Sequence, residues 1–310
     1  MNAPRTITEY LKQLRAALRG ADPALIQDAL YDAEEHLRAE MAENTQRSEA
    51  EMLAHVVGTY GAPEEVADIY RDQEVKIQRA LRPPPMPKRR SLLGRFFGVA
   101  ADSRTWGALF YMLLALVTGI FYFVWAVTGI SLSMGLSVLI IGIPFLVLFL
   151  STVRALSLLE GRIVETMLGV RMPRRPPYPA HAGKSFKQRV GGIFTDGRTW
   201  TTLLYMILML PLGIVYFTIT ITLLSVSIAF IGSPLILALD HYGLGEFLGD
   251  GHATINWGYG AHVMNWGDVI GLCIIGIVLL FTTMHLVRAL GAMHGAIAKG
   301  LLVRSGERVA

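Results

Sequence analysis

The chain begins with a polar segment and then alternates between long uncharged stretches and short charged ones. No Lys, Arg, Asp or Glu occurs in residues 105–153, 199–239 or 269–287. A helix needs about 20 apolar residues to cross the hydrocarbon of a bilayer, so the first stretch is long enough for two crossings. The pattern predicts four membrane-spanning helices, near residues 107–129, 133–153, 201–231 and 268–288.

The first 80 residues carry the pattern of a small soluble helical bundle. Apolar residues recur every three or four positions, as Tyr10, Leu14 and Leu18 do, which is the spacing of one buried helix face. Helix start and stop signals divide this region into four helices. These signals are Gly20, Asp22 with Pro23, Ser48 with Glu51 in the spacing of a capping box, and Gly61 to Pro63.

The membrane part of the sequence is duplicated. Residues 102–123 and 196–217 are related by a constant offset of 94 and are identical at 13 of 22 positions, including the tripeptide R-T-W. A second pair of matching segments begins with V-R-A-L at residues 153 and 287. Each repeat therefore reads as an interfacial helix, R-T-W, two spans, and a second interfacial helix that begins at V-R-A-L.

The duplication and two proline-rich segments predict the domain organisation. The segment TGISLSMGLS, residues 128–137, is expected to connect the spans of the first repeat, whereas the second repeat inserts about 44 additional residues. We expect an all-α polytopic membrane protein with two repeated two-span hairpins and an N-terminal soluble helical bundle. Its parts are a helical domain at 1–80, a basic linker at 81–90, a first membrane repeat at 91–172, a second linker at 173–183, and a second membrane repeat at 184–310.

Composition and charge support a membrane protein and indicate its orientation. The chain is 53% hydrophobic and 17% charged, a high apolar content for a soluble protein. Lys and Arg cluster beside the spans but are absent from 199–287, where four acidic residues lie. Because cytoplasmic flanks of spans are enriched in Lys and Arg, we expect a multi-pass protein of the cell membrane with both termini in the cytoplasm and an outside loop at about 232–267. In a five-span alternative, 199–239 folds into a hairpin and the basic C-terminal residues lie outside.

Arginine and tryptophan residues flank the spans on the side predicted to be cytoplasmic. Arginine can extend toward lipid phosphates, and tryptophan prefers the headgroup region. An alternative is that the two arginines of the R-T-W segments bind a specific anionic lipid. With membrane lipids as partners, we predict interface anchors at Arg104, Trp106, Arg198, Trp200, Arg154 and Arg288.

The loop between the last two spans distinguishes the second repeat from the first. It is rich in glycine and aromatic residues and contains the tripeptide N-W-G twice, at residues 256 and 265. The aromatic residues of such a loop can lie on the outer leaflet. Our hypothesis is instead a ligand-sensing lid or pocket, with an aromatic wall of Trp257, Tyr259 and Trp266 and polar contacts from Asp250 and His252.

Several functional classes find no support in the residues. Residues 1–80 contain 15 acidic against 9 basic residues, which disfavours direct binding of nucleic acid. The single cysteine, Cys273, allows no internal disulfide, and the histidines of the outer loop lack the spacing of a strong metal motif. No G-x-S-x-G or H-E-x-x-H motif occurs. We expect a protein that is not an enzyme and uses no metal or cofactor.

Two family resemblances rest on these segments. YLKQLRAALRG, DAEEHL and YGAPEEVADIYR resemble the HAAS signalling domain, a small helical module. The span repeats resemble the bacterial Putative sensor domain family in the pattern RTW..LLY...LPLG and in the closing segment HLVRALGAMHGAIAKGLL. In that family the membrane part often precedes a histidine kinase, and HAAS domains are often associated with PadR-type transcription regulators.

The resemblance implies a membrane sensor for signal transduction, which passes an envelope, lipid or small-ligand signal to a cytoplasmic partner through residues 1–80. A PadR-type regulator or a histidine kinase is the implied partner. A second copy of the chain, in a homo-oligomer, is an alternative partner. The alternative function is an accessory subunit of a transporter or a small channel. The uncharged spans favour the sensor, because they offer no buried charge to select or drive a solute.

The orientation can be tested by the accessibility of single cysteines. In a Cys273→Ala background, the cysteines of Ser48→Cys and Gly183→Cys are expected to be shielded from a membrane-impermeant thiol reagent in intact cells, whereas Gly251→Cys should be labelled. Labelling of all three after permeabilisation is the control for reactivity. Labelling of Gly183→Cys from outside would show that the four-span arrangement is wrong.

Overall fold

The computed structural model describes residues 3–43, 48–81, 91–139, 141–175, 197–242, 254–256 and 261–303. The fold is helical, as the sequence predicts. Within the described residues the only strands are β1 (Thr254–Asn256) and β2 (Ala261–Val263), which pair antiparallel. The chain forms two compact units. The first comprises Met1–Pro85, Phe121–Met209 and Met293–Ala310, and the second comprises Met86–Ile120 and Leu210–Ala292.

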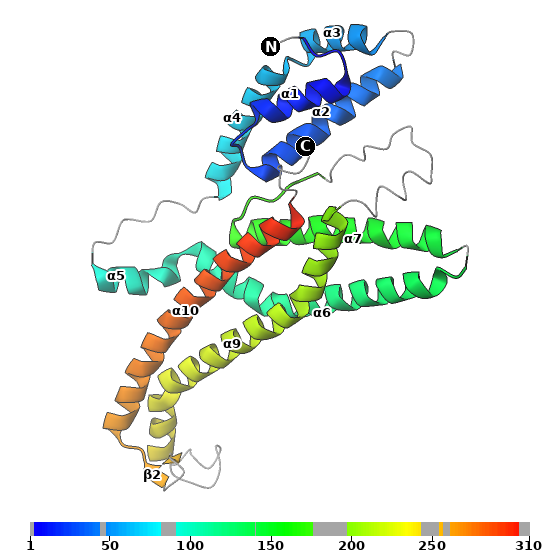
Figure 1. Cartoon of the computed structure of the whole chain (residues 1–310). Coiled ribbons are helices and arrows are strands. Elements are labelled where there is room, and N and C mark those ends of the chain that lie inside the picture. The colour runs from blue at the N-terminus through cyan, green and yellow to red at the C-terminus, as the bar shows by residue number, and fades with distance from the viewer. Residues whose placement is uncertain are drawn as a thin grey trace. The chain divides into compact units, whose positions relative to one another are not determined.

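Four helices form the N-terminal bundle within the first compact unit (Figure 1): α1 (Ile7–Ala17), α2 (Pro23–Glu43), α3 (Glu49–Thr59) and α4 (Pro63–Leu81). Their apolar faces meet in a core in which Leu14, Leu37 and Leu53 are fully buried. The hydroxyl of Tyr10 donates to the backbone carbonyl of Gly61 (2.9 Å), which joins α1 to the turn before α4. The four helices predicted from the apolar spacing are confirmed.

Local signals set the ends of these helices. Ser48 accepts a hydrogen bond from the backbone N–H of Glu51, and Glu51 accepts one from the backbone N–H of Ser48, so the predicted capping box is present. Gly61 has a φ of 110°, a conformation that glycine adopts without a steric penalty. This residue reverses the chain between α3 and α4.

Within the described residues, four helices are long and apolar enough to cross a membrane: α6 (Ser103–Leu136), α7 (Gly142–Leu168), α9 (Gly197–His241) and α10 (Trp266–Leu302). This number agrees with the predicted spans. Helix α9 runs unbroken through Pro211 and Pro234, so residues 199–239 do not form the hairpin that the five-span alternative requires. Proline is tolerated inside membrane helices because neighbouring groups satisfy the freed carbonyls.

Residues 128–137, predicted to be the connection of the first repeat, are largely helical. Helix α6 continues to Leu136, and α7 begins at Gly142. No proline or charge interrupts this segment, and the hydroxyl of Ser133 donates back to the carbonyl of Gly129 (2.6 Å), a bond compatible with a continuing helix. The tight reversal lies nearer to Gly142, where a Cβ atom would be 2.2 Å from the carbonyl oxygen of Leu136.

The interfacial helices predicted at the ends of the repeats are only in part separate helices. Before the first R-T-W, α5 (Leu92–Phe97) and the 3-10 helix η1 (Gly98–Ala101) form a short piece of their own. After each V-R-A-L the chain stays helical without a break, to Leu168 in α7 and to Leu302 in α10. Before the second R-T-W, Gly197 begins α9, and residues 176–196 lie outside the described ranges.

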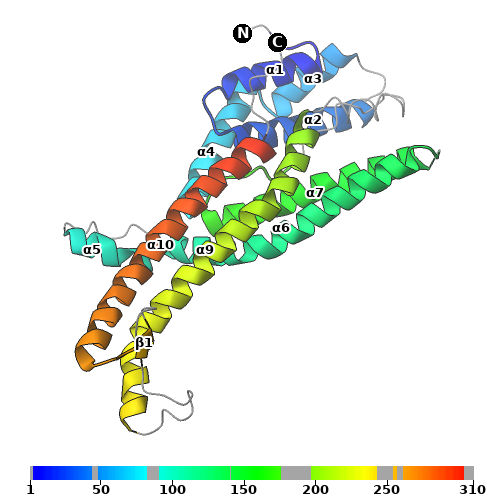
Figure 2. The same ribbon diagram turned by 60° about the horizontal axis from the view of Figure 1, so that its bottom comes forward.

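Glycine lets α9 pack closely against its neighbours in the second compact unit. Helices α9 and α10 run side by side there (Figure 2), and a Cβ atom added to Gly276 would lie 2.8 Å from the Cβ of Phe230 and 2.9 Å from the backbone nitrogen of Ile231. A Cβ atom at Gly213 would lie 2.3 Å from the carbonyl oxygen of Ala115 in α6. Small residues that let backbones approach are typical of helix contacts in membranes.

Gly276→Ala is expected to destabilise the contact between α9 and α10, because the new methyl group overlaps the backbone of α9. Overpacking costs about 1–3 kcal/mol, against the ~1 kcal/mol that alanine gains over glycine inside a helix. Gly271→Ala, also in α10 and with no such neighbour within 4 Å, is the matched control and should be neutral or stabilising. Thermal unfolding of the detergent-solubilised protein measures both effects, and equal midpoints for the two variants would contradict the packing.

Candidate functional site

A short extended segment after α7 lies against the N-terminal bundle within the first compact unit. Helix α7 ends at Leu168, and Gly169 adopts the left-handed conformation (φ 68°) with its N–H bonded to the carbonyl of Glu165 (3.1 Å). A left-handed glycine ends a helix and turns the chain away from the helix axis. Residues 170–175 then contact α2 and α4, and these contacts are made chiefly by arginines.

The guanidinium of Arg171 lies buried among three carboxylates from three helices. It is paired with Asp28 of α2 (Nη2–Oδ2 2.9 Å), Glu74 of α4 (Nε–Oε2 3.2 Å) and Glu165 of α7 (Nη1–Oε1 3.4 Å). It also donates to the backbone carbonyl of Met172. Arg171 is 6% exposed, and its three acidic partners are buried as well. One side chain thus joins the end of α7 to two helices of the bundle.

Helix α2 also binds the backbone of this segment. Asp28 Oδ1 accepts hydrogen bonds from the N–H groups of Arg174 (2.7 Å) and Arg175 (2.9 Å). The side-chain amide of Gln27 donates to the carbonyl of Arg175 (2.7 Å). Asp28 therefore binds the segment through both oxygens, one to the guanidinium of Arg171 and one to the main chain.

Two further cations extend the contact with the acidic surface of α2. Arg175 pairs with Asp32 (Nε–Oδ1 3.2 Å), and its guanidinium lies 5.5 Å from the ring centroid of Tyr31, within the range of a cation–π interaction. From the end of α10, Lys299 Nζ lies 2.5 Å from Asp22 Oδ2 at the start of α2. These pairs are more exposed than Arg171, so each contributes less to stability.

The surroundings of the cluster shift the pKa of two of its members, Asp28 and Arg171. Desolvation raises the pKa of Asp28, and the opposing hydrogen bonds from the Arg175 and Arg174 N–H groups and from Arg171 do not offset it. For Arg171, burial acts to lower the pKa, but the carboxylates of Asp28 and Glu74 outweigh it and raise the pKa. Arg171 therefore stays charged and holds together carboxylates that would otherwise repel one another.

A second buried polar cluster takes one side chain from each of the four long helices. The carboxylate of Glu160 in α7 accepts hydrogen bonds from the hydroxyls of Tyr122 in α6 (2.9 Å) and Tyr205 in α9 (2.8 Å). The hydroxyl of Tyr205 also lies 3.0 Å from Nε2 of His294 in α10. Glu160 is 1% exposed and His294 is fully buried. All four residues belong to the first compact unit, and Glu160 lies on the same helix as Glu165 of the Arg171 cluster.

The duplication relates the members of this second cluster. With the two V-R-A-L segments aligned, Glu160 occupies the position of His294. In the R-T-W segments, Tyr205 corresponds to Tyr111 and Tyr122 to Tyr216. Of these pairs, only Glu160 and His294 both belong to the cluster, where the first repeat provides a carboxylate and the second an imidazole.

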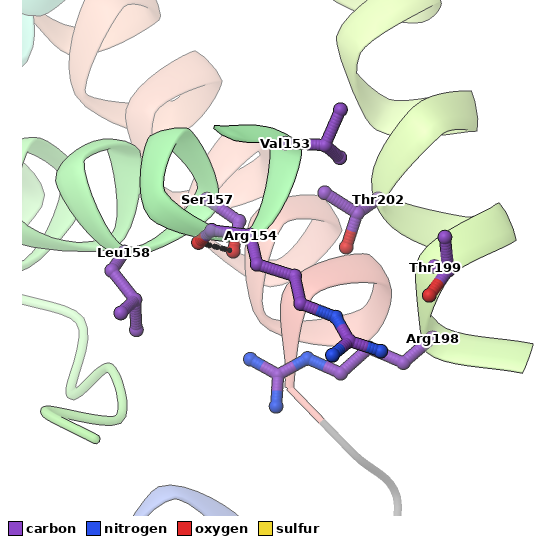
Figure 3. A pocket seen from close by; sticks show the side chains of 7 residues that line it. All are labelled: Val153, Arg154, Ser157, Leu158, Arg198, Thr199 and Thr202. Carbon is purple, nitrogen blue, oxygen red and sulfur yellow. Dashed lines mark hydrogen bonds between the residues drawn. The ribbon is translucent and has the colours of Figure 1, made fainter. Parts of the chain in front are cut away.

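The predicted interface anchors differ in their surroundings. Trp106 and Trp200 are 52% and 55% exposed, as side chains in a headgroup layer would be. Arg288 pairs with Asp102 (2.9 Å), which also accepts the backbone N–H of Arg104 (3.1 Å). Figure 3 shows Arg154 and Arg198 reaching the same recess, beside Thr199 and Thr202 at the start of α9. The role of these residues as anchors stays a prediction.

Most of the predicted sensing residues lie outside the described residues: Trp257, Tyr259, Asp250 and His252. Trp266 is described; it begins α10 and is exposed. The second N-W-G tripeptide has a local role, because the side chain of Asn265 accepts the N–H groups of Gly267 (2.8 Å) and Asp268 (3.2 Å). Among the described residues, no three His, Cys, Asp or Glu side chains are arranged to hold a metal ion.

Comparison with protein families matches both parts of the chain. Residues 111–302 match the family described as Putative sensor, and residues 9–68 match HAAS. The first match covers more than half of the chain. The protein belongs to the Putative sensor family. No curated protein and no solved structure matches the chain.

Membership in the Putative sensor family, together with the HAAS match, supports a sensor or signalling role and suggests a non-catalytic one. Residues of the Arg171 cluster lie in both matched regions. Asp28 lies in the HAAS match, whereas Glu165 and Arg171 lie in the Putative sensor match. The cluster is therefore a point at which side chains from both matched regions are bonded to each other.

Neither cluster of this Putative sensor family protein was predicted from the sequence. Arg171 reads as one of several basic residues after a span, and the chain separates it from Asp28 by more than 140 residues. Glu160 could have been recognised from the sequence as a residue with a special role. It is the only acidic residue between Asp102 and Glu165, and it aligns with a histidine in the second repeat.

Arg171→Gln is expected to release residues 170–175 from the bundle, because the buried carboxylates of Asp28 and Glu74 lose the cation that pairs with both. Breaking a buried ion pair from one side costs about 3–5 kcal/mol. Hydrogen–deuterium exchange of the purified protein should therefore become faster in residues 170–175 and in the facing parts of α2 and α4.

Arg162→Gln is the matched control, since Arg162 pairs with the same Glu165 (3.0 Å) but is half-exposed. An exposed pair of this kind contributes about 0–1 kcal/mol, so this variant should exchange like the wild type. Equal protection of residues 170–175 in both variants would contradict the assigned role of Arg171.

Proposed function

We propose that this protein is a multi-pass sensor of the cell membrane that passes an envelope, lipid or small-ligand signal to a cytoplasmic partner through its N-terminal helical bundle. The observation that carries the proposal is the Arg171 cluster, because its carboxylates come from the bundle and from the end of an apolar helix. The distribution of Lys and Arg along the chain supports a cytoplasmic position for this cluster and for both termini.

Helix α7 provides the mechanical link in this proposal. Through Glu160 it is hydrogen-bonded to α6 and α9, and through Tyr205 it is connected to α10. Glu165 lies little more than one helical turn further along α7 and belongs to the Arg171 cluster. A displacement of α7 relative to the other helices thus acts on both clusters together.

The burial of Arg171 favours two discrete states over a gradual response. Coupling between a sensing site and an output typically amounts to about 1–3 kcal/mol. A buried ion pair that loses one partner costs about 3–5 kcal/mol, so the cluster resists partial opening. The bundle is then either held by the segment after α7 or released with its carboxylates exposed to water.

The input in this proposal is the segment between α9 and α10, which has no counterpart of this length in the first repeat. The outside loop predicted at about 232–267 starts later than expected, because α9 continues to His241. Trp257, Tyr259 and Trp266 are its proposed aromatic wall, and Asp250 and His252 its polar contacts. A ligand shifts a two-state protein only by binding one state better. The proposed receivers of the signal are a PadR-type regulator or a histidine kinase, in line with the HAAS match.

The proposal is tested by epistasis in the native host. A deletion strain is complemented with the wild type, with Arg171→Gln, with residues 241–266 replaced by the sequence of residues 137–141, which lie between α6 and α7, or with both changes. Transcript profiles are then compared under envelope stress. The loop replacement is expected to abolish the stress-dependent change. Arg171→Gln should fix the output in one state, and the double variant should behave like Arg171→Gln because the cluster acts after the loop.

Protein abundance measured by immunoblotting and the Arg162→Gln strain serve as controls. A milder loop variant, Trp257→Ala with Trp266→Ala, should reproduce the loop replacement without removing the backbone. A normal stress response in the Arg171→Gln strain at normal abundance would show that the cluster does not carry the signal. A normal response after loop replacement would show that this loop is not the sensor.

A further inference from the structure

We propose that the acidic face of α2 and α4 is a peptide-binding groove, which a cytoplasmic partner protein enters with an extended arginine-containing segment in place of residues 171–175. The inference rests on the proposed function, since it assigns the chemistry of the partner contact. We call this surface the arginine groove; it is formed by Asp22, Gln27, Asp28, Asp32 and Glu74.

The arginine groove binds features that many extended segments share. Asp28 accepts two successive backbone N–H groups, and Gln27 donates to the carbonyl that follows them. These bonds do not depend on the side chains of the bound segment, as in other modes of recognition that use main-chain hydrogen bonds. An extended strand of another protein can therefore satisfy the same atoms.

Specificity for arginine comes from the buried end of the arginine groove. Asp28 and Glu74 approach different nitrogens of one guanidinium, Nη2 and Nε. A planar group with several fixed donors matches two carboxylates at once, whereas the ammonium of lysine is a point charge on a flexible stem. The groove should therefore distinguish arginine from lysine at this position.

The segment in the groove leaves one of its acceptors unused. Gln27 Oε1 is buried and accepts no hydrogen bond from the described part of the chain, although the amide nitrogen of the same side chain is bonded to Arg175. A buried acceptor without a donor is unfavourable. A partner segment that supplies this donor would bind better than residues 171–175 do.

Tethering explains why such a partner would bind only after a signal. A short linker gives an attached segment an effective concentration on the order of millimolar, so residues 171–175 keep a free competitor out. Movement of α7 lowers that occupancy, and the apparent affinity for a competitor rises in proportion to the fraction of open groove. The negative charge of the groove disfavours anionic lipids and nucleic acids as occupants.

The experiment uses full-length protein in detergent and the fluorescein-labelled peptide LGVRMPRRP, the sequence of residues 168–176. Fluorescence anisotropy is expected to show weak binding to the wild type and at least about tenfold tighter binding to Arg171→Ala, whose own segment no longer occupies the groove. Asp28→Asn in the Arg171→Ala background should lose this gain. A peptide with lysine in place of its first arginine should bind at least about tenfold more weakly.

Two further variants keep the test informative. Arg171→Lys retains the charge and should bind the peptide with intermediate affinity, even if Arg171→Ala proves unstable. Arg162→Ala should bind like the wild type.

Equal peptide affinity of the wild type and both Arg171 variants, with bundle helicity unchanged by circular dichroism, would overturn the groove. A wild-type dimer in light scattering that dissociates on Arg171→Ala would overturn the partner assignment in favour of a second copy. If the peptide binds none of these proteins, the groove is wrong. The proposed function is then still judged by the response in the native host, which does not depend on the peptide.

Discussion

The desolvation of one guanidinium is the constraint on which the connection between the bundle and the apolar helices depends. Arg171 is buried because three helices surround it, and its positive charge in turn offsets part of the repulsion among the carboxylates of those helices. Such mutual dependence produces cooperative contacts, since a charge that has lost its partner in a low-dielectric site is strongly unfavourable.

Duplication supplied the framework of the membrane part, and divergence of single side chains supplied its polar contacts. Glu160 and His294 are equivalent in the two repeats but differ in chemistry, and Tyr205 lies between them. In the second compact unit, Asp102 from the start of the first repeat pairs with Arg288 from the end of the second. The repeats are thus joined both through equivalent positions, Glu160 and His294, and through residues at or beside the two repeated motifs, Asp102 before R-T-W and Arg288 in V-R-A-L.

Features encoded over short distances were predictable from the sequence, and those that join distant residues were not. The spacing of apolar residues and the Ser48–Glu51 capping box predicted the helices of the bundle. The lengths of the uncharged stretches predicted the four spans. The connection at 128–137 was misplaced because Gly and Ser suggest a turn, whereas the Ser133 hydroxyl bonds within the helix. The Arg171 cluster depends on which acidic residues a fold brings together, and spacing along the chain carries no such information.

The position of Tyr205 between a carboxylate and an imidazole fixes where protons reside in the buried cluster. Its hydroxyl has a single hydrogen, which is donated to Glu160, so toward His294 the oxygen can act only as an acceptor. The imidazole must then carry hydrogen on Nε2. The donors therefore point one way through the cluster, from the imidazole of α10 to the hydroxyl of α9 and from that hydroxyl to the carboxylate of α7. Three helices of the apolar part are thus joined by hydrogen bonds of a single polarity.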